Sequence, residues 1–85
     1  MPTICLFLGV VIRMYYNDHL PPHFHAEYGE DEALYEIETL RVIGGELPRR
    51  VHALVLEWAD LHREELLENW RRARKGEGLH KIEPL

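Results

Sequence analysis

The sequence predicts an α+β fold, in which a small antiparallel sheet of three to four strands carries one long C-terminal helix on one face. Two observations predict it. Up to residue 38, apolar residues recur at every second position, which is the period of a half-buried strand. From residue 48 to residue 75 they recur mainly at steps of three to five, which indicates an amphipathic helix. Strands followed by a helix form two packed layers.

Length and composition limit what such a chain can do. The 85 residues predict a single domain, 1–85, and a chain this small buries only roughly 60–65% of its unfolded surface. A second copy or a partner chain would help to stabilise it. The net charge of −5 disfavours nucleic acid as a partner, because phosphate contacts need clustered cations. Cys5 is the only cysteine and is expected to be a small buried hydrophobe, as fits a cytoplasmic protein.

The first strand region covers residues 4–16. Alternation is clearest over 10–16, and residues 4–8 form either a separate strand or the same strand before a bulge at Gly9. The apolar run 4–12 is too short to span a bilayer, and no cleavage site for a signal peptide follows it, so no membrane association is expected. Asparagine, aspartate and two prolines within residues 17–22 then predict a turn.

The next two strands are predicted at 23–28 and 33–38, joined as a hairpin. A loop centred between Glu30 and Asp31 keeps apolar residues opposite apolar residues, which favours this register. The predicted pairs are Tyr28 with Ala33, Ala26 with Tyr35, Phe24 with Ile37, Glu27 with Leu34, His25 with Glu36, and His23 with Glu38.

This alternation divides the sheet into two faces. The face under the helix is predicted to hold Ile12, Met14, Phe24, Ala26, Tyr28, Tyr35 and Ile37. The open face is predicted to hold Arg13, Tyr15, His23, His25, Glu27 and Glu36.

The helix is predicted over Pro48 to Lys75. Pro48 suits a first helical turn, and Gly76 follows a cluster of cations that suits a helix C-terminus. One continuous helix is favoured over two helices with a bend near His62 and Arg63. The last residues, 79–85, are expected to lie extended against the body.

Five segments carry a family resemblance across essentially the whole chain. They are MPTI, VVIRMYY, PPHFHAEY, LHREELLENW and KIEPL, and together they resemble small bacterial proteins of the domain of unknown function 4160 family. The resemblance implies a short cytoplasmic protein encoded beside a second small protein, the pair forming a toxin–antitoxin-like module. It implies no catalytic or binding residues.

Histidines at alternate positions indicate a metal site. His23 and His25 share one strand face, and same-face neighbours lie roughly 6.5–7 Å apart, so their imidazoles can converge on one ion. Two imidazoles with Glu27 form a ligand set of catalytic zinc or non-haem iron. Three ligands in one straight row span too far, which favours Glu36 or Glu38 from the neighbouring strand as the third ligand of a divalent metal such as zinc. A metal-dependent hydrolase is one reading of such a site.

Two other interpretations of the same face stay open. His25 with Glu36 and His23 with Glu38 would form ordinary cross-strand pairs worth roughly 0.2–1 kcal/mol each. Alternatively, a metal-independent ribonuclease toxin would use His25 as general acid or base, Arg13 to stabilise a phosphate and Tyr15 to position it.

The favoured hypothesis is a protein-interaction component of a two-gene, toxin–antitoxin-like module. It would form a homodimer or bind the cognate small protein through the open sheet face or a sheet edge. The thin core and the two-sided sheet favour an interaction, and the family resemblance supplies the module.

Overall fold

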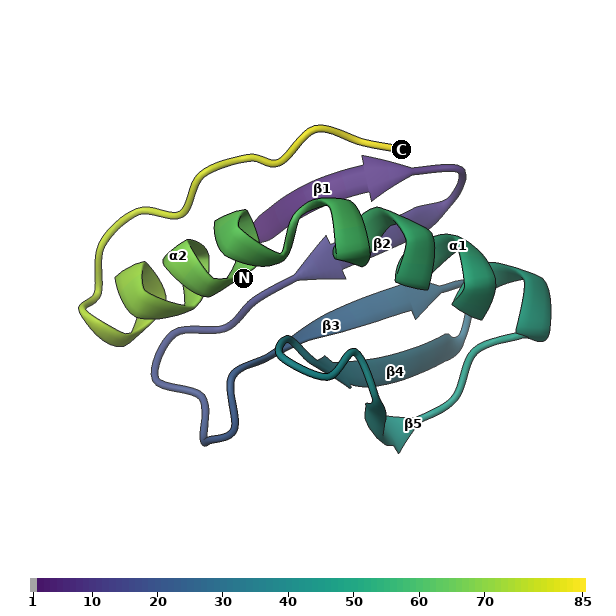
Figure 1. Ribbon diagram of the computed structural model, residues 1–85, viewed down its shortest axis with the longest axis horizontal. Helices are drawn as coiled ribbons and strands as arrows, with labels where there is room; N and C mark the ends of the chain where they lie inside the picture. The colour runs from purple at the N-terminus through teal and green to yellow at the C-terminus, as the bar shows by residue number, and fades with distance from the viewer. Residues whose placement is uncertain (1) are drawn as a thin grey trace.

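The computed structural model describes residues 2–85 and shows one antiparallel sheet covered by two helices (Figure 1). The strands follow one another in space in chain order, so the sheet is a meander. The elements are β1 (Thr3–Phe7), β2 (Val10–Arg13), β3 (His23–Tyr28), β4 (Asp31–Glu36), β5 (Val42–Gly45), α1 (Arg49–Leu61) and α2 (Arg63–Arg74). The α+β class therefore holds, but the predicted three to four strands and single long helix are wrong.

The sheet has more strands than predicted because β1 and β2 are separate strands and because β5 was not predicted. β1 and β2 are separate strands that meet as a hairpin, because Leu8 and Gly9 both have left-handed φ angles, 48° and 84°, as a tight two-residue turn requires. β5 was missed because its sequence, VIGG, ends in two glycines and reads as a turn. Gly45 fits there because its backbone passes close to Glu32, where a Cβ would lie 2.0 Å from the carbonyl oxygen.

The β3–β4 hairpin forms with a register two residues away from the predicted one. Phe24 pairs with Tyr35, Ala26 with Ala33, and His23 with Glu36. The loop is only Gly29 and Glu30, and Gly29 has φ 59°, the left-handed conformation that tight hairpin turns favour in glycine. Since a shift of two residues keeps every side chain on its face, the two faces were nevertheless predicted almost correctly. Tyr28 is the exception on the helix side, with 38% of its surface exposed.

The predicted continuous helix breaks at His62, whose φ and ψ of −126° and 26° are not helical. A continuous helix would place His62 and Arg63 three and four residues after the buried Ala59, on the inward face. The break leaves the Arg63 side chain partly exposed, while the His62 ring lies half-buried against Trp58 and contacts Glu65. The Arg63 guanidinium donates to Asp60 and to the Glu38 carbonyl.

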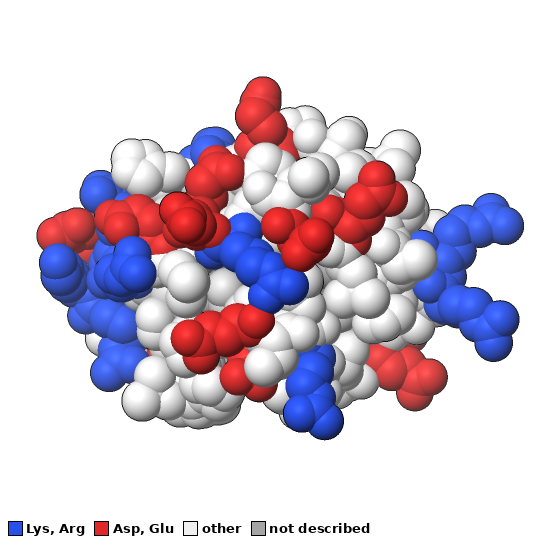
Figure 2. All heavy atoms as spheres, viewed as in Figure 1, with Lys and Arg blue, Asp and Glu red and all other residues white. Residues whose placement is uncertain are grey.

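Charged side chains of both signs cover the outer surface of the helices (Figure 2). Acidic and basic groups alternate over the α2 end, and basic side chains project where α1 begins. This face shows no continuous basic surface, in agreement with the net charge of −5. Neither helix in the described part of the chain, 2–85, has the length and apolar character needed to cross a membrane.

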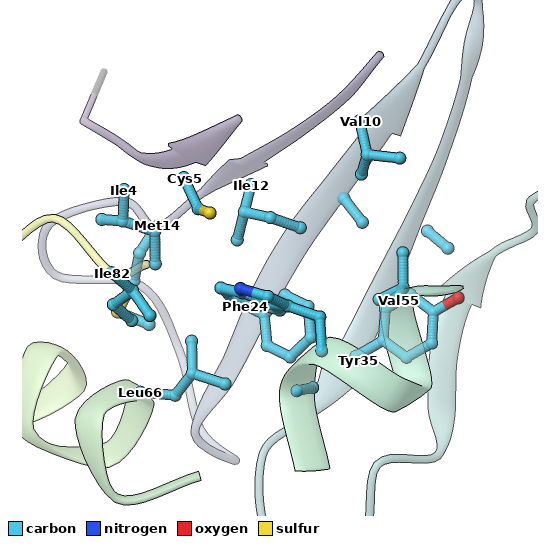
Figure 3. Packing of buried hydrophobic residues seen from close by; sticks show 14 of the residues in the cluster. Ile4, Cys5, Val10, Ile12, Met14, Phe24, Tyr35, Val55, Leu66 and Ile82 are labelled. Atoms are coloured by element: carbon cyan, nitrogen blue, oxygen red, sulfur yellow. The ribbon is translucent and has the colours of Figure 1, made fainter. Parts of the chain in front are cut away.

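Trp58 is at the centre of the core between the sheet and the helices (Figure 3 shows the surrounding residues). Its ring is fully buried and lies 5.5 Å from Phe7 and 5.9 Å from Phe24. Cys5 is buried, as predicted, and burial raises the pKa of its thiol.

The C-terminal segment lies extended beside β1, as the sequence predicted (Figure 1). The Ile82 amide donates to the Ile4 carbonyl, and the Trp58 indole N–H donates to the Glu83 carbonyl at 2.8 Å. Asn69 of α2 holds the same segment through two hydrogen bonds to the His80 backbone. One edge of the sheet is therefore covered by the chain's own tail.

Candidate metal centre

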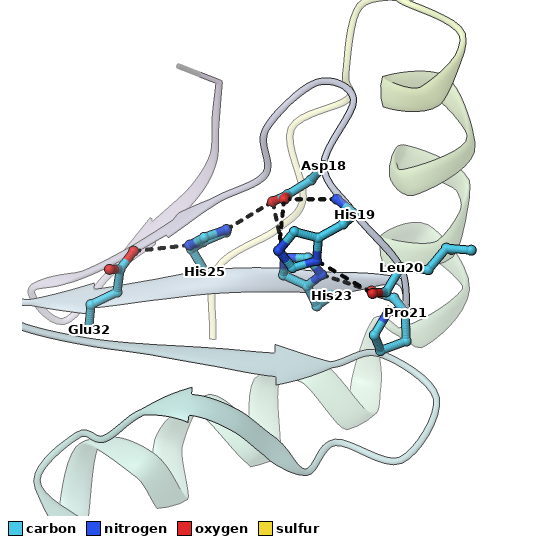
Figure 4. Close-up of polar contacts among 7 residues, drawn as sticks. All are labelled: Asp18, His19, Leu20, Pro21, His23, His25 and Glu32. Atoms are coloured by element: carbon cyan, nitrogen blue, oxygen red, sulfur yellow. Dashed lines mark hydrogen bonds and ion pairs between the residues drawn. The ribbon is translucent and has the colours of Figure 1, made fainter.

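The predicted histidines meet an aspartate from the loop between β2 and β3. This loop carries Asp18 back over the start of β3, where Oδ2 lies 3.0 Å from Nε2 of His23 and 3.2 Å from Nε2 of His25 (Figure 4). One ligand atom from each of the three residues lies within 4.8 Å of the others. Two atoms bound to a tetrahedral zinc at 2.0–2.1 Å are roughly 3.3 Å apart, so the carboxylate–imidazole spacing suits such an ion.

The other nitrogen of each ring is already engaged. Nδ1 of His23 lies 2.8 Å from the Pro21 carbonyl oxygen, and Nδ1 of His25 lies 3.0 Å from Oε2 of Glu32 (Figure 4). A carbonyl or carboxylate oxygen only accepts, so each Nδ1 must carry the donated hydrogen. Both rings are thereby held with Nε2 directed at the same oxygen of Asp18. Metal-binding histidines in proteins are characteristically oriented by such an acceptor on the second nitrogen.

Hydrogen bonding leaves a conflict at Asp18 that a cation would resolve. If each ring carries only its Nδ1 hydrogen, each Nε2 presents a lone pair to the carboxylate oxygen, and two acceptors at 3.0–3.2 Å repel. Burial alone would raise the pKa of Asp18, but hydrogen bonds from His25 and the His19 amide, together with both imidazoles, lower it below its usual value. An ionised carboxylate is compatible with two arrangements: a proton on each Nε2, which is the arrangement that lowers this pKa, or a metal ion between the oxygen and the two nitrogens.

The surroundings differ between the two rings. His23 was predicted on the open face, but only 1% of its surface is exposed. The β2–β3 loop and Trp70 of α2 enclose it, and the centroids of the His23 and Trp70 rings are 5.3 Å apart. His25 is partly exposed, and the Tyr15 ring meets it edge-on at 4.5 Å. Burial, and then the charges of Glu27 and Glu32, raise the pKa of Tyr15.

The predicted glutamate ligands lie elsewhere. Glu27 pairs with Arg13 at 3.2 Å, so neither is directed at the histidines. Within residues 2–85 the Glu36 side chain makes no hydrogen bond or ion pair, although it stands opposite His23 across the strands. Glu38 lies beyond the end of β4, and its backbone carbonyl accepts from Arg63.

The predicted ion pairs of His25 with Glu36 and His23 with Glu38 do not form, because the register differs by two residues. The geometry gives little support to the hypothesis of a metal-independent ribonuclease. Arg13 forms an ion pair with Glu27 and donates a hydrogen bond to Thr3 at 3.1 Å, so it presents no free cation beside His25.

Asp18 and Glu32 are the site residues that sequence reasoning missed. Asp18 was interpreted only as a turn former, and Glu32 was placed in the loop after β3. A signal for Asp18 was available, since it precedes His23 by five residues, with a proline pair between them that folds the chain back.

Comparison with known proteins places the whole of this segment inside a family. The model for DUF4160, a domain of unknown function, matches residues 9–71. The chain belongs to this family. The family predicted from the sequence segments is therefore confirmed. No curated protein and no solved structure matches the chain. The DUF4160 description assigns no activity, so the function is argued from the site.

Proposed function

We propose that this DUF4160 protein binds a divalent transition metal of the zinc class through Asp18, His23 and His25. One observation carries the proposal: two imidazoles, each with Nδ1 donating to an acceptor, direct Nε2 at a single carboxylate oxygen. A metal ion there would take the Nε2 lone pairs and the carboxylate oxygen as ligands and remove the repulsion between them.

Protons on both Nε2 atoms are the competing explanation. They would make two imidazolium ions whose ring centroids lie 5.3 Å apart, one of them with no exposed side-chain surface. Burying a charged ring costs hydration energy, and the two like charges repel. A metal is bound instead by neutral imidazoles, and its charge is shared among all its ligands, which avoids two adjacent imidazolium ions.

The ligand types select among metals. Imidazole nitrogens suit zinc, copper, iron and nickel, whereas magnesium and calcium prefer all-oxygen sites. Two histidines and one carboxylate are also the protein ligands of several zinc centres. Three protein ligands leave one position of a tetrahedron for a water molecule or for a fourth side chain.

Metal analysis tests the proposal. Protein purified without a polyhistidine tag and stripped with a chelator is titrated with zinc by calorimetry, and bound metal is quantified by mass spectrometry. The wild type is expected to bind one zinc ion per chain. Asp18→Asn, which keeps the size of the side chain but removes its charge, is expected to weaken binding by at least the 10–100-fold that outer-shell changes cost.

Glu36→Gln is the matched control, because it removes a predicted ligand on the adjacent strand that the structure places outside the site. It is expected to bind zinc as the wild type does. A wild type that takes up no stoichiometric zinc, or equal zinc affinity in the Asp18→Asn and Glu36→Gln variants, would contradict the proposal.

We also propose that the chain is the interaction component of a two-gene, toxin–antitoxin-like module, as the family resemblance implies. Exposed apolar side chains at two places on the sheet support it. Leu6 and Leu8 expose 63% and 68% of their surface at the β1–β2 end, and Val42 and Ile43 expose 41% and 42% on edge strand β5. Exposed clusters of large apolar residues are typical of surfaces that bind another protein.

Light scattering during size-exclusion chromatography separates the possible partners. The purified chain is expected to run as a dimer, or to shift to a defined heterocomplex when mixed with the product of the adjacent gene. A monomer at high micromolar concentration that is unchanged by that product would refute the interaction role.

A further inference from the structure

A third imidazole lies beside the candidate metal centre, with an orientation similar to that of His23 and His25. His19 directly follows Asp18, and its Nδ1 lies 3.4 Å from the Leu20 carbonyl oxygen. Its Nε2 lies 3.9 Å from Oδ1 of Asp18, and its ring stacks on His23 at 5.5 Å and 29° (Figure 4). All three rings therefore place Nδ1 against an acceptor oxygen and direct Nε2 toward Asp18.

Little else in the fold explains this position of His19. Its side chain is 80% exposed, so it adds nothing to the core. The 3.4 Å contact to Leu20 is a weak hydrogen bond at best, whereas the corresponding contacts of His23 and His25 measure 2.8 and 3.0 Å. His19 is oriented like a ligand but held loosely, as a residue that moves onto the ion when it binds would be.

We infer that His19 is the fourth ligand and closes the metal centre as a four-coordinate site of three histidines and one aspartate. This inference rests on the proposed metal-binding function. Nε2 of His19 lies 3.9 Å from Oδ1 of Asp18, whereas His23 and His25 face Oδ2, and only Asp18, His23 and His25 already have ligand atoms within 4.8 Å of one another. The exposed His19 side chain therefore has to move toward the other ligands when the ion binds, since ligand atoms on a tetrahedral zinc are roughly 3.3 Å apart.

The consequence concerns what the metal does. Four protein ligands leave no position for water, which is the arrangement of structural zinc sites, whereas catalytic sites keep one position open. Two ligands, Asp18 and His19, come from the β2–β3 loop, and two, His23 and His25, come from β3. The ion therefore fastens the loop to the sheet and sets the shape of the surface around it, and the site does not hydrolyse a substrate.

Cobalt substitution distinguishes a closed site from an open one. Co²⁺ bound to the wild type is expected to show the intense visible absorption bands of a four-coordinate ion and no spectral change when free imidazole is added. Co²⁺ bound to His19→Ala is expected to absorb differently and to respond to added imidazole, which fills the vacated position. Zinc affinity of this variant should fall at least tenfold, the lower bound for outer-shell changes.

His80→Ala is the control, because it removes a histidine that lies on the C-terminal segment beside Glu64, Glu65 and Glu68 of α2, and its cobalt spectrum should match the wild type. Circular dichroism verifies that both variants are folded. A wild-type cobalt spectrum that responds to imidazole as the His19→Ala spectrum does would overturn the closed site while leaving the three-ligand site standing. Wild-type protein that binds neither cobalt nor zinc would instead refute the proposed function itself.

Discussion

Gly45 on edge strand β5 offers a stringent test of the fold, because replacing it with alanine cannot be accommodated by side-chain movement. The new Cβ would lie 2.0 Å from the Glu32 carbonyl oxygen, 3.0 Å from its carbon and 3.2 Å from Cα of Ala33, all backbone atoms of β4. Gly45 also has φ 68°, a conformation that costs an L-residue about 1–2 kcal/mol. Strand β5 must therefore move away from β4.

The magnitude follows from adding the contacts that this movement breaks. The Glu46 amide donates to the same Glu32 carbonyl at 3.0 Å, and losing such a hydrogen bond costs about 1 kcal/mol. Together with the backbone conformation, Gly45→Ala should lower the free energy of unfolding by about 2–3 kcal/mol. Urea denaturation followed by tryptophan fluorescence measures it.

Two other glycines serve as controls. Gly29 also has a left-handed φ, 59°, but a Cβ there meets nothing within 4 Å, so Gly29→Ala should cost only about 1–2 kcal/mol. Gly78 has an ordinary φ and equally open surroundings, so Gly78→Ala should be neutral or stabilise by up to about 1 kcal/mol. If Gly45→Ala destabilises no more than Gly29→Ala, the pairing of β4 with β5 is wrong.

The same substitution connects the sheet edge to the metal centre. Glu32 supplies both the carbonyl that Gly45 approaches and the carboxylate that accepts from His25. Displacing its backbone should move that carboxylate, so Gly45→Ala should also bind zinc more weakly than Gly29→Ala does, although neither residue is a ligand.

Three further predictions concern single side chains. Glu32→Ala should weaken zinc binding about 10–100-fold, because His25 loses the acceptor that orients its ring. Calorimetry of the variant and the wild type measures the difference, and an unchanged zinc affinity would show that Glu32 does not belong to the site. Burial raises the pKa of Tyr35 to about 12. The stability that the folded state gains from this shift is complete below the usual tyrosine pKa of about 10, and it is lost as the pH rises through 12. Absorbance at 295 nm should show this late titration, and Tyr35→Phe should abolish it. Trp58→Phe should lower the free energy of unfolding by about 2–3 kcal/mol, because it removes one hydrogen bond to Glu83 and roughly two methylene equivalents of packing. Amide hydrogen exchange in the C-terminal segment should become faster. Exchange equal to that of the wild type would show that the Trp58–Glu83 hydrogen bond does not hold this segment.

Alternation of apolar residues along the sequence determines much of the architecture. It placed Phe24 and Ala26 under the helices and His25 on the opposite face, and all three assignments hold, since the first two are fully buried and His25 contacts Tyr15 and Glu32. Side-chain direction along a strand depends only on local geometry with a period of two, so even a register error of two residues left it unchanged.

The errors arose where local patterns compete with contacts between distant residues. The break at His62 depends on which helix face meets the sheet, and β5 forms despite its two glycines because β4 offers an unpaired edge. Both outcomes follow from packing that no short window of sequence contains.

The candidate site shows the same division. Chain periodicity indicated that His23 and His25 converge, but it could not indicate Asp18, whose carboxylate reaches them only because residues 17–22 fold back over the start of β3. It could not exclude Glu27 either, because the ion pair with Arg13 is a contact between two strands. The residues of a strand share a face by local geometry, whereas a ligand set is defined by distances in space, and those are decided by the tertiary structure.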